Sequence, residues 1–197
     1  MGSDPIRLRE GVREAYSRAA TCPADAHPFP VGEDFARSLG YPPELLRQIP
    51  RASLDSFSGV SNVSIFAVIP PGATVVDLGC GSGLDSLIAA QRTGAAGRVI
   101  GLDFSLPMLQ RAICSKRQAS FTQLGFIQSA AEHLPLGAAS ADQALVNGIF
   151  NLNPFRDRIF SELARVLKPG GTVFGAELLL AAPLDADARA NPGNWFS

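Results

Sequence analysis

The sequence predicts an α/β protein in which a doubly wound, mostly parallel sheet carries helices on both faces. From Ala73 onward, short apolar runs rich in β-branched residues alternate with longer segments of helical periodicity. A glycine-rich loop joins the first of these strands to the first of these helices. Apolar strands that alternate with helices are typical of a parallel sheet with right-handed crossovers.

Two regions are expected along the chain. Residues 1–70 should form a helical N-terminal extension, with helices near 6–20, 35–39, 43–49, 52–57 and 63–68 separated by proline-rich turns. Residues 71–197 should form the ligand-binding α/β domain. Its strands are predicted at 74–78, 98–103, 125–128, 143–147 and 172–180, and its helices at 84–93, 105–118 and 153–167. A turn is predicted at 168–171.

Composition narrows the possible partners. The chain has 197 residues, of which 46% are hydrophobic, and a formal net charge of −1. This length allows one domain with a sizeable core, and the charge argues against a nucleic-acid partner. We expect no membrane span and a cytoplasmic location, because the sequence has no long apolar run and no signal-type segment. Cys22, Cys80 and Cys114 lie far apart, so we expect neither disulfides nor a metal site.

The strongest signal is VDLGCGSG at 76–83, directly after the first strand. Gly79, Gly81 and Gly83 allow a tight turn and a close approach to a ligand, and the next helix offers free N–H groups. Cys80 lies within the loop, and Asp77 precedes it at the end of the strand. The sequence therefore predicts a ligand-binding loop.

Two ligand classes use such a loop. A dinucleotide site needs GxGxxG, but the third glycine position, counted from Gly79, is Leu84 here. Asp77 would repel a pyrophosphate and suits a cation. The loop therefore favours S-adenosyl-L-methionine (SAM), which carries an ammonium and a sulfonium, and a nicotinamide dinucleotide is the alternative.

The nucleoside half of the ligand should lie at the ends of the second and third strands. Asp103 follows the loop by about 20 residues, where a carboxylate can accept both ribose hydroxyls. Phe104 and Met108 are candidates to cover the adenine face, with core packing as an equal alternative. The backbone of Ala131 and Glu132 is expected to meet adenine.

These segments together resemble the class I SAM-dependent methyltransferase family over about 73–180. VDLGCGSG (76–83) resembles its first motif and VIGLDFSLPML (99–109) its second strand with the acidic end. AEHLP (131–135) resembles its adenine segment and RVLKPGG (165–171) the turn before its fifth strand. The resemblance implies a Rossmann-like fold, SAM as cofactor and methyl transfer. Where this family often has an aspartate for the adenine amino group, the chain has Ala130.

Within that family, the chain is most similar to the arsenite methyltransferase and ubiquinone/menaquinone methyltransferase-like group. The stretch ALVNGIFNLNP (144–154) resembles the arsenite enzymes' SNCVINLSP, and 55–60 resembles their lead-in. The resemblance implies cysteine ligands for As(III) at two positions that are Val60 and Gly148 here. We therefore expect a small, apolar methyl acceptor and no arsenite activity.

The acceptor should enter above the fourth strand. We expect Asn147 to contact the cofactor. Gly148, Phe150 and Asn151 should line the mouth through which the acceptor enters, and Tyr16 should belong to a lid from the N-terminal part. Helix packing and turn formation are open alternatives for Tyr16 and Asn151. No catalytic side chain is predicted, because the sulfonium is already activated and the protein needs to hold the acceptor in line. A SAM-binding protein without catalysis is the alternative.

The chain after the fifth strand is short compared with this family, which adds a helix and a two-stranded hairpin. Only 181–197 follow here, so we expect the hairpin to be missing. The fifth strand would then form a bare apolar edge, which invites pairing with another chain. This predicts a homodimer through that edge, or cover of the edge by the N-terminal helices.

Overall fold

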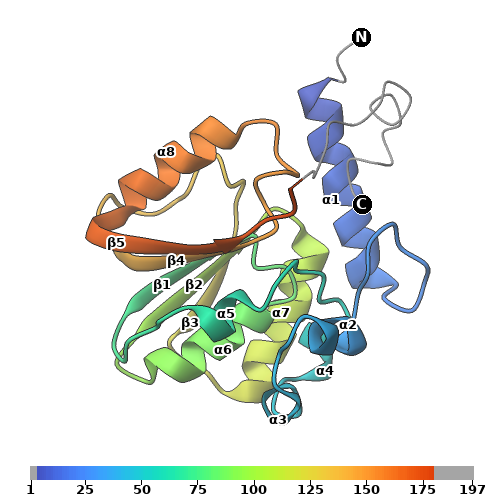
Figure 1. Ribbon diagram of the computed structural model, residues 1–197, viewed down its shortest axis with the longest axis horizontal. Coiled ribbons are helices and arrows are strands. Elements are labelled where there is room, and N and C mark those ends of the chain that lie inside the picture. Colours follow the sequence, from blue (N-terminus) through green and yellow to red (C-terminus); the bar gives the residue numbers. More distant parts are fainter. Residues whose placement is uncertain (1–3, 180–197) are drawn as a thin grey trace.

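The computed structural model contains a five-stranded parallel sheet with the order β3-β2-β1-β4-β5 (Figure 1). The structure describes residues 4–179. The strands are β1 Thr74–Leu78, β2 Arg98–Asp103, β3 Leu124–Gln128, β4 Ala141–Asn147 and β5 Leu167–Ala176. The predicted fold class is confirmed. The expected absence of the terminal hairpin concerns 181–197, which lie outside the described residues.

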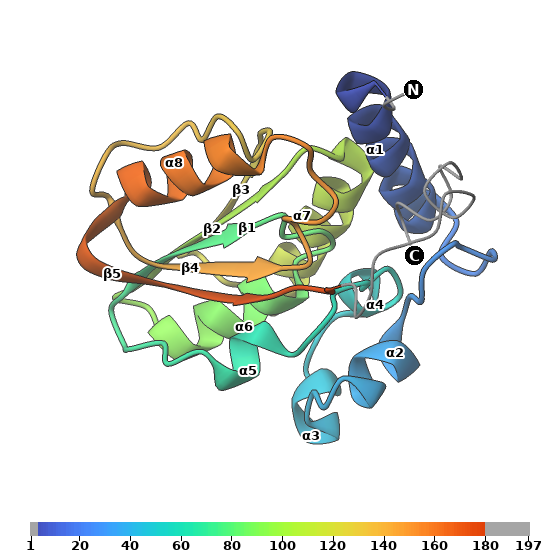
Figure 2. The same ribbon diagram turned by 45° about the horizontal axis from the view of Figure 1, so that its top comes forward.

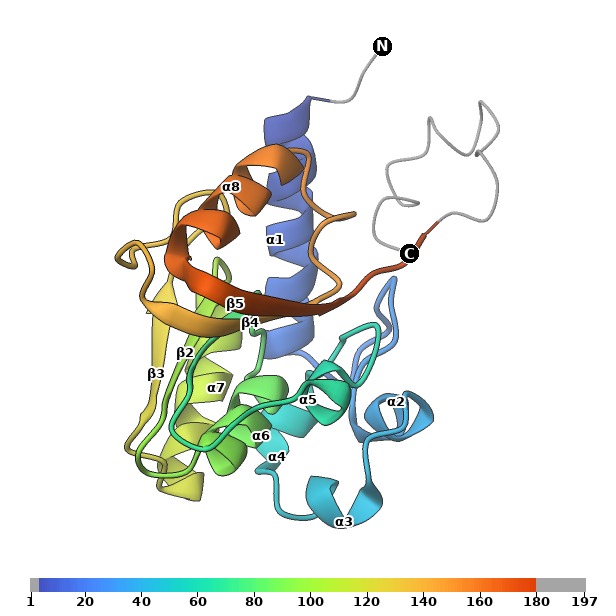
Figure 3. The ribbon, with the colours of Figure 1, turned by 60° about the vertical axis from the view of Figure 1, so that its left-hand side comes forward.

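Helices cover both faces of the sheet. On one face lie α5 (Val63–Phe66), α6 (Leu84–Thr93) and α7 (Leu106–Ala119), and on the other lies α8 (Arg156–Val166) (Figures 1 and 3). Strands between two helical layers are buried on both sides, so they are apolar almost throughout instead of alternating. This explains why the apolar runs of the sequence located β1 and β4 well.

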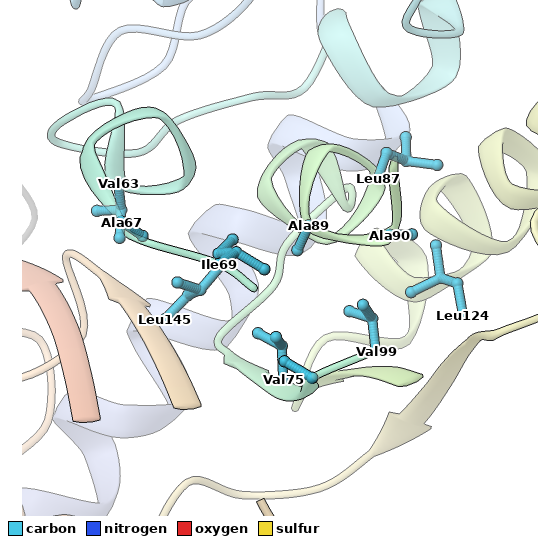
Figure 4. Packing of buried hydrophobic residues seen from close by; sticks show 11 residues of the cluster. Val63, Ala67, Ile69, Val75, Leu87, Ala89, Ala90, Val99, Leu124 and Leu145 are labelled. Atoms are coloured by element: carbon cyan, nitrogen blue, oxygen red, sulfur yellow. The ribbon is translucent and has the colours of Figure 1, made fainter. Parts of the chain in front are cut away.

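The main core lies between the sheet and the α5–α6 layer. Val75 and Val99 of neighbouring strands pack with Leu87 of α6, and Val63 of α5 lies in the same cluster as Leu145 of β4 (Figure 4). These side chains are fully buried. Burial of each such side chain contributes about 1.5–3 kcal/mol, which holds the carboxyl ends of the strands in a fixed register.

The N-terminal helices stand beside the carboxyl ends of the strands (Figure 2). They are α1 Pro5–Thr21, α2 Glu33–Ser38, α3 Pro43–Leu46 and α4 Arg51–Leu54. Asp4 caps α1 by accepting the Ile6 amide. The other end of α1 docks on α7, where Ser17 Oγ lies 2.9 Å from Oγ of Ser105, the residue that caps α7. This contact brings one side of α1 next to the strand ends.

The last strand differs from the prediction. β5 spans Leu167–Ala176, whereas 172–180 was expected. The predicted turn at 168–171 is an irregularity within the strand, because Ala141 pairs with Leu167 while Gln143 pairs with Thr172. Pro169 lacks an amide for the ladder, and Gly170 has a φ of 81°, so the strand bulges there and then continues.

Within residues 4–179, no helix combines the length and the apolar character needed to cross a membrane. Cys22, Cys80 and Cys114 are all unpaired thiols.

Candidate cofactor and acceptor site

A pocket opens at the carboxyl ends of the central strands and encloses about 980 Å³ including its mouth. Its wall comes from the glycine loop, the ends of β1, β2 and β4, the segments 56–59, 147–149 and 152–153, and one side of α1. In open parallel sheets, ligands bind in a crevice outside the carboxyl ends of the strands. The structure therefore brings the sequence-predicted segments together where such a ligand would lie.

Most of the residues singled out in the sequence line this pocket. They are Tyr16, Asp77, Gly79, Cys80, Gly81, Asp103, Phe104, Ala131, Glu132, Asn147 and Gly148. Other lining residues were not among those singled out in the sequence, above all Arg9, Asp85 and Asn153. Arg9 lies on the same helical face as Val12 and Tyr16, and a charged residue on an otherwise apolar face is a signal that could have found it.

Gly83 and Met108 lie outside the pocket lining and serve packing instead. Met108 is fully buried against Ala19 and Ala20, between α1 and α7, and its sulfur would lie 4.0 Å from a Cβ at Gly81. A Cβ at Gly83 would meet Cβ of Ala112 at 3.0 Å. This glycine therefore lets the start of α6 approach α7.

Phe150 and Asn151 also lie outside the pocket lining, which corrects their placement at the acceptor mouth. The Phe150 ring stacks on Phe160 of α8, with 4.5 Å between the ring centroids. The Asn151 Oδ1 atom is buried without a hydrogen-bond partner among the described residues. The backbone turns at Gly148, which has a φ of 76°, and the side chains after Ile149 leave the pocket until Leu152.

The glycine loop is fixed to β2 by its own amides. Gly79 and Cys80 donate to the Leu102 carbonyl at 2.7 and 2.9 Å. Gly79 and Gly81 have φ values of 68° and 52°, a region that favours glycine. A Cβ at Gly79 would collide with Ile149, so this glycine also makes room for the chain that follows β4.

Asp103 braces the loop from the end of β2. Its Oδ2 accepts the Gly81 amide at 2.8 Å, and its Oδ1 accepts the Ser105 amide at 2.8 Å. Burial raises the pKa of Asp103 to about 6, although these amide hydrogen bonds act in the opposite direction. A carboxylate has about four acceptor positions. Asp103 therefore retains acceptor capacity for ligand hydroxyls at the pocket wall.

Asp77 lies buried behind the loop, where it accepts a hydrogen bond from the Ser86 hydroxyl. Burial, followed by the charge of nearby Asp85, raises the pKa of Asp77 to about 8. Asp85 in the first turn of α6 accepts the Tyr41 hydroxyl at 2.7 Å and the Ser64 amide at 3.2 Å. Two carboxyl groups thus face the same end of the pocket.

The pocket is acidic overall. Its buried lining contains the carboxyl groups of Asp77, Asp85, Asp103 and Glu132, whereas Arg9 is the one basic side chain among its described lining residues. Opposite charge stabilises buried ionised carboxylates and like charge destabilises them. The pocket therefore favours a cationic ligand and disfavours a pyrophosphate.

Asn147 connects the end of β4 to the lead-in segment. Its Oδ1 accepts the amides of Val60 and Ser61 at 2.9 and 3.1 Å. Its Nδ2 donates to the Ser61 carbonyl at 2.7 Å and to Oδ2 of Asp85 at 2.9 Å. Although Asn147 lines the pocket, its polar atoms are thus engaged in holding the pocket wall.

Val60 and Gly148 meet beside this network. A Cβ at Gly148 would lie 2.9 Å from Cγ1 of Val60. These are the two positions at which the resemblance to arsenite enzymes implies cysteines, and they are adjacent in space although neither carries a thiol. Among residues 4–179, the structure contains no cluster of His, Cys, Asp or Glu able to hold a metal ion.

Aromatic residues from the N-terminal region gather next to the pocket. Tyr16 stacks on Phe29 with 4.5 Å between centroids, and His27 lies 6.2 Å from Phe29. Burial, followed by the charges of Asp103 and Glu177, raises the pKa of the Tyr16 hydroxyl. This hydroxyl stays protonated at neutral pH and can donate a hydrogen bond into the pocket.

SAM-dependent methyltransferases and dinucleotide-binding proteins share a parallel sheet with this strand order, a glycine loop after β1 and a buried acid at the end of β2. The acidic lining of the pocket favours the class of SAM-dependent methyltransferases. The chain belongs to the methyltransferase domain family, whose sequence profile matches residues 69–195. The predicted family, Rossmann-like fold and SAM cofactor are thereby confirmed.

The relatives are methyltransferases for two kinds of acceptor. The chain is similar to an arsenite methyltransferase of Halobacterium salinarum, with 32% identity over 204 residues that cover 96% of this chain and 52% of that protein. A demethylmenaquinone methyltransferase of Bacillus licheniformis is 35% identical over 106 residues, 53% of this chain and 44% of that protein. The chain spans about half the length of these curated relatives.

A solved structure shows the same architecture. The arsenic(III) SAM methyltransferase of Chlamydomonas reinhardtii superimposes with a TM-score of 0.62 and 28% identity, covering 83% of this chain and 54% of that one. The similarity therefore extends beyond the SAM-binding segments into the N-terminal helices.

Proposed function

We propose that this chain transfers the methyl group of SAM to a small, carbon-rich acceptor. The observation that carries this proposal is the contact between Val60 and Gly148 beside the acidic cofactor pocket. Soft ions such as As(III) need soft thiolate ligands, and these two positions offer hydrocarbon and backbone instead. An acceptor with apolar surface fits this wall better than arsenite does.

The strand order supports the assignment of the two halves of the site. Asp103 at β2 suits the ribose, and the glycine loop with Asp77 at β1 suits the methionyl end of the cofactor. The next strand in the sheet is β4, so the acceptor belongs beside Asn147 and Gly148. We retain Gly79, Cys80, Phe104 and Ala131 as further cofactor contacts, and Tyr16 as an acceptor contact.

When bound, SAM supplies an activated methyl group on a sulfonium. The chain's own task is to exclude water and to hold the acceptor in line with that methyl group. Ile149 and Leu152 give the pocket wall apolar surface near the end of β4, and the Tyr16 hydroxyl on the α1 side is available to donate a hydrogen bond to a bound acceptor. The carboxyl groups of Asp77 and Asp85 favour a cation at the methionyl end.

The test is a transfer assay with SAM labelled in its methyl group. The acceptor panel contains naphthoquinols, simple phenols and arsenite, and the label is followed into products after separation. We expect label in a phenolic or quinol product and none in methylated arsenic. Transfer to arsenite alone would contradict the proposal.

A second candidate function is SAM binding without catalysis, and a third is nicotinamide-dependent oxidoreduction. Calorimetric titration with SAM, its demethylated product and NAD separates them. Binding of SAM without turnover on the whole panel would favour the second function. Binding of NAD without SAM would favour the third, against the expectation from the acidic pocket.

We also propose that β5 pairs with the β5 strand of a second copy. β5 is the edge of the described sheet, and Val173 within it is 40% exposed. Light scattering should give twice the monomer mass, and Val173→Lys should lower it. A monomeric wild-type chain overturns this proposal.

A cytoplasmic location is a further proposal. It is supported by the exposed, unpaired thiols of Cys22 and Cys114, because such thiols persist in reducing compartments. Alkylation of the protein in intact cells, followed by mass spectrometry, should find both cysteines reduced.

A further inference from the structure

We infer that the Glu132 side chain, held by Arg9 of α1, recognises the exocyclic amine of the cofactor's adenine. The inference rests on the proposed use of SAM and assigns a specificity-determining residue within that site. It goes beyond the expectation that only the backbone near Glu132 meets the base.

The sheet order fixes where the base must lie. With the ribose at Asp103 on β2, the base points either toward β1 or toward β3, which flank β2. The glycine loop fills the β1 side. The base therefore lies at the end of β3, where Ser129, Ala131 and Glu132 line the pocket.

Few side chains at this end of the pocket can accept a hydrogen bond from an amine. Ala130 has no polar side-chain atom, and the Ser129 hydroxyl, which donates to the His133 carbonyl at 2.7 Å, offers only a neutral acceptor, which is weaker than a carboxylate. Among the described pocket residues that follow β3, Glu132 supplies the carboxylate, and its side chain is only 3% exposed. A buried carboxylate needs hydrogen-bond donors, and an adenine amine is a suitable one.

Two pocket residues hold this carboxylate in place. Oε1 of Glu132 accepts from Nη1 of Arg9 at 3.4 Å and from Nδ2 of Asn153 at 3.1 Å. These contacts come from α1 and from the loop before α8, so Glu132 joins three parts of the pocket wall. Arg9 acts through Glu132 and is therefore a positioning residue.

Discrimination follows from the direction of the hydrogen bond. Adenine presents an amine donor at this position, whereas hypoxanthine presents a carbonyl oxygen. A carboxylate accepts from the first and repels the second. A site built around a buried polar group rejects an analogue that leaves the group unpaired.

The experiment compares S-adenosylhomocysteine with S-inosylhomocysteine by calorimetry on the full chain. The variants are Glu132→Gln and Arg9→Gln. Arg13→Gln is the matched control, because Arg13 pairs with Glu10 on the same helix and is absent from the pocket lining. Melting curves of each variant confirm folding.

We expect the wild type and Arg13→Gln to prefer the adenine ligand by about 10-fold or more, as for a hydrogen bond to a charged group. Glu132→Gln should reduce the preference to about 2-fold, because a glutamine amide can turn its donor toward the carbonyl. Arg9→Gln should give an intermediate preference, because the carboxylate remains but is held by Asn153 alone.

Every outcome of this experiment either supports or overturns the inference about Glu132. An undiminished preference in Glu132→Gln, with S-adenosylhomocysteine still bound, overturns the inference and leaves the proposed function intact. If Glu132→Gln does not fold, Arg9→Gln decides, and a wild-type preference in that variant overturns the inference. Failure of the wild type to bind S-adenosylhomocysteine overturns both the inference and the proposed function.

Discussion

Asn147 and Asp85 are joined by a hydrogen bond of 2.9 Å from Nδ2 to Oδ2. This bond ties the end of β4 to the first turn of α6. The same asparagine holds the lead-in segment through the amides of Val60 and Ser61. The acceptor wall beside Gly148 is therefore built by a buried polar network that spans three distant parts of the chain.

Replacing Asn147 with alanine should destabilise the ligand-free protein. The variant leaves the Val60 and Ser61 amides and one oxygen of Asp85 without this partner, and a cost of about 2–3 kcal/mol is expected for such a loss. Urea unfolding measures it. Asn62→Ala is the control, because Asn62 makes a single exposed hydrogen bond to the Gly40 carbonyl. Equal losses in the two variants would contradict the network.

Valine at Gly81 should abolish SAM binding. Gly81 has a φ of 52° and lines the pocket, so a branched side chain strains the loop and projects next to the ligand. Gly94→Val is the matched control, because Gly94 has a φ of 68° and ends α6 away from the pocket. Both variants should lose about 1–3 kcal/mol of stability, because each places valine at a backbone conformation that favours glycine, and calorimetry should find binding lost only in Gly81→Val. Retained affinity in Gly81→Val would count against the loop as the binding site.

Removing the charge of Asp103 should weaken SAM binding. Asp103→Asn keeps the shape but turns one ribose acceptor into a donor, and Asp103→Ala removes both acceptors. We expect affinity to fall about 10- to 100-fold, since hydrogen bonds to charged groups contribute about 1.5–3 kcal/mol.

Asp142→Asn provides the control for the Asp103 variants. Asp142 lies near the start of β4, at the opposite end of the sheet, where it accepts the Thr74 amide and pairs with Lys168. The affinity of the Asp142→Asn variant for SAM should equal that of the wild type. An Asp103→Ala protein that is folded and binds SAM normally would remove the ribose assignment.

The stability of the ligand-free protein should fall as the pH rises. The folded-state pKa values of Asp77, about 8, and Asp103, about 6, both exceed the ordinary value of 3.8. The folded protein therefore binds more protons than the unfolded chain between these values, and its free energy of unfolding decreases from about pH 5 to about pH 8.

Urea unfolding across that pH range tests the sign. Asp77→Asn should flatten the dependence above about pH 6, because Asp103 alone then contributes. Glu162, whose pKa its hydrogen bond with Arg165 lowers to about 2, is ionised throughout and cannot mask the effect. A stability that increases with pH would contradict the burial of these carboxyl groups.

The strands and the glycine loop were predictable because their signals are local. β1 and β2 are short apolar runs that end in Asp77 and Asp103, and a strand buried on both faces has little freedom in composition. The same holds for the positive φ at Gly79, which the loop pattern requires. The boundary at residue 70 between a helical extension and the SAM-binding domain stays a prediction.

The remaining features of the fold and the site could not be predicted, because they depend on contacts between residues that are distant along the chain. Met108 and Phe150 have the chemistry of ligand contacts, yet Met108 packs with α1 and Phe150 with α8. Arg9 and Asp85 lay outside the motifs of the sequence, and only the docking of α1 and the first turn of α6 brings them to the pocket. The irregular start of β5 depends on its pairing with β4.

The sequence by itself determined the parallel sheet, the loop from Asp77 to Gly83 and the acid at Asp103, because each follows from residue type and spacing along the chain. Only the tertiary structure decided that Val60 lies against Gly148, that Asn147 binds the lead-in segment in the pocket wall, and that Arg9 donates a hydrogen bond to Glu132. Val60 and Gly148 are 88 positions apart along the chain, Val60 and Asn147 are 87 apart, and Arg9 and Glu132 are 123 apart. Side chains at such separations meet only after the helices have packed on the sheet, which no local pattern specifies.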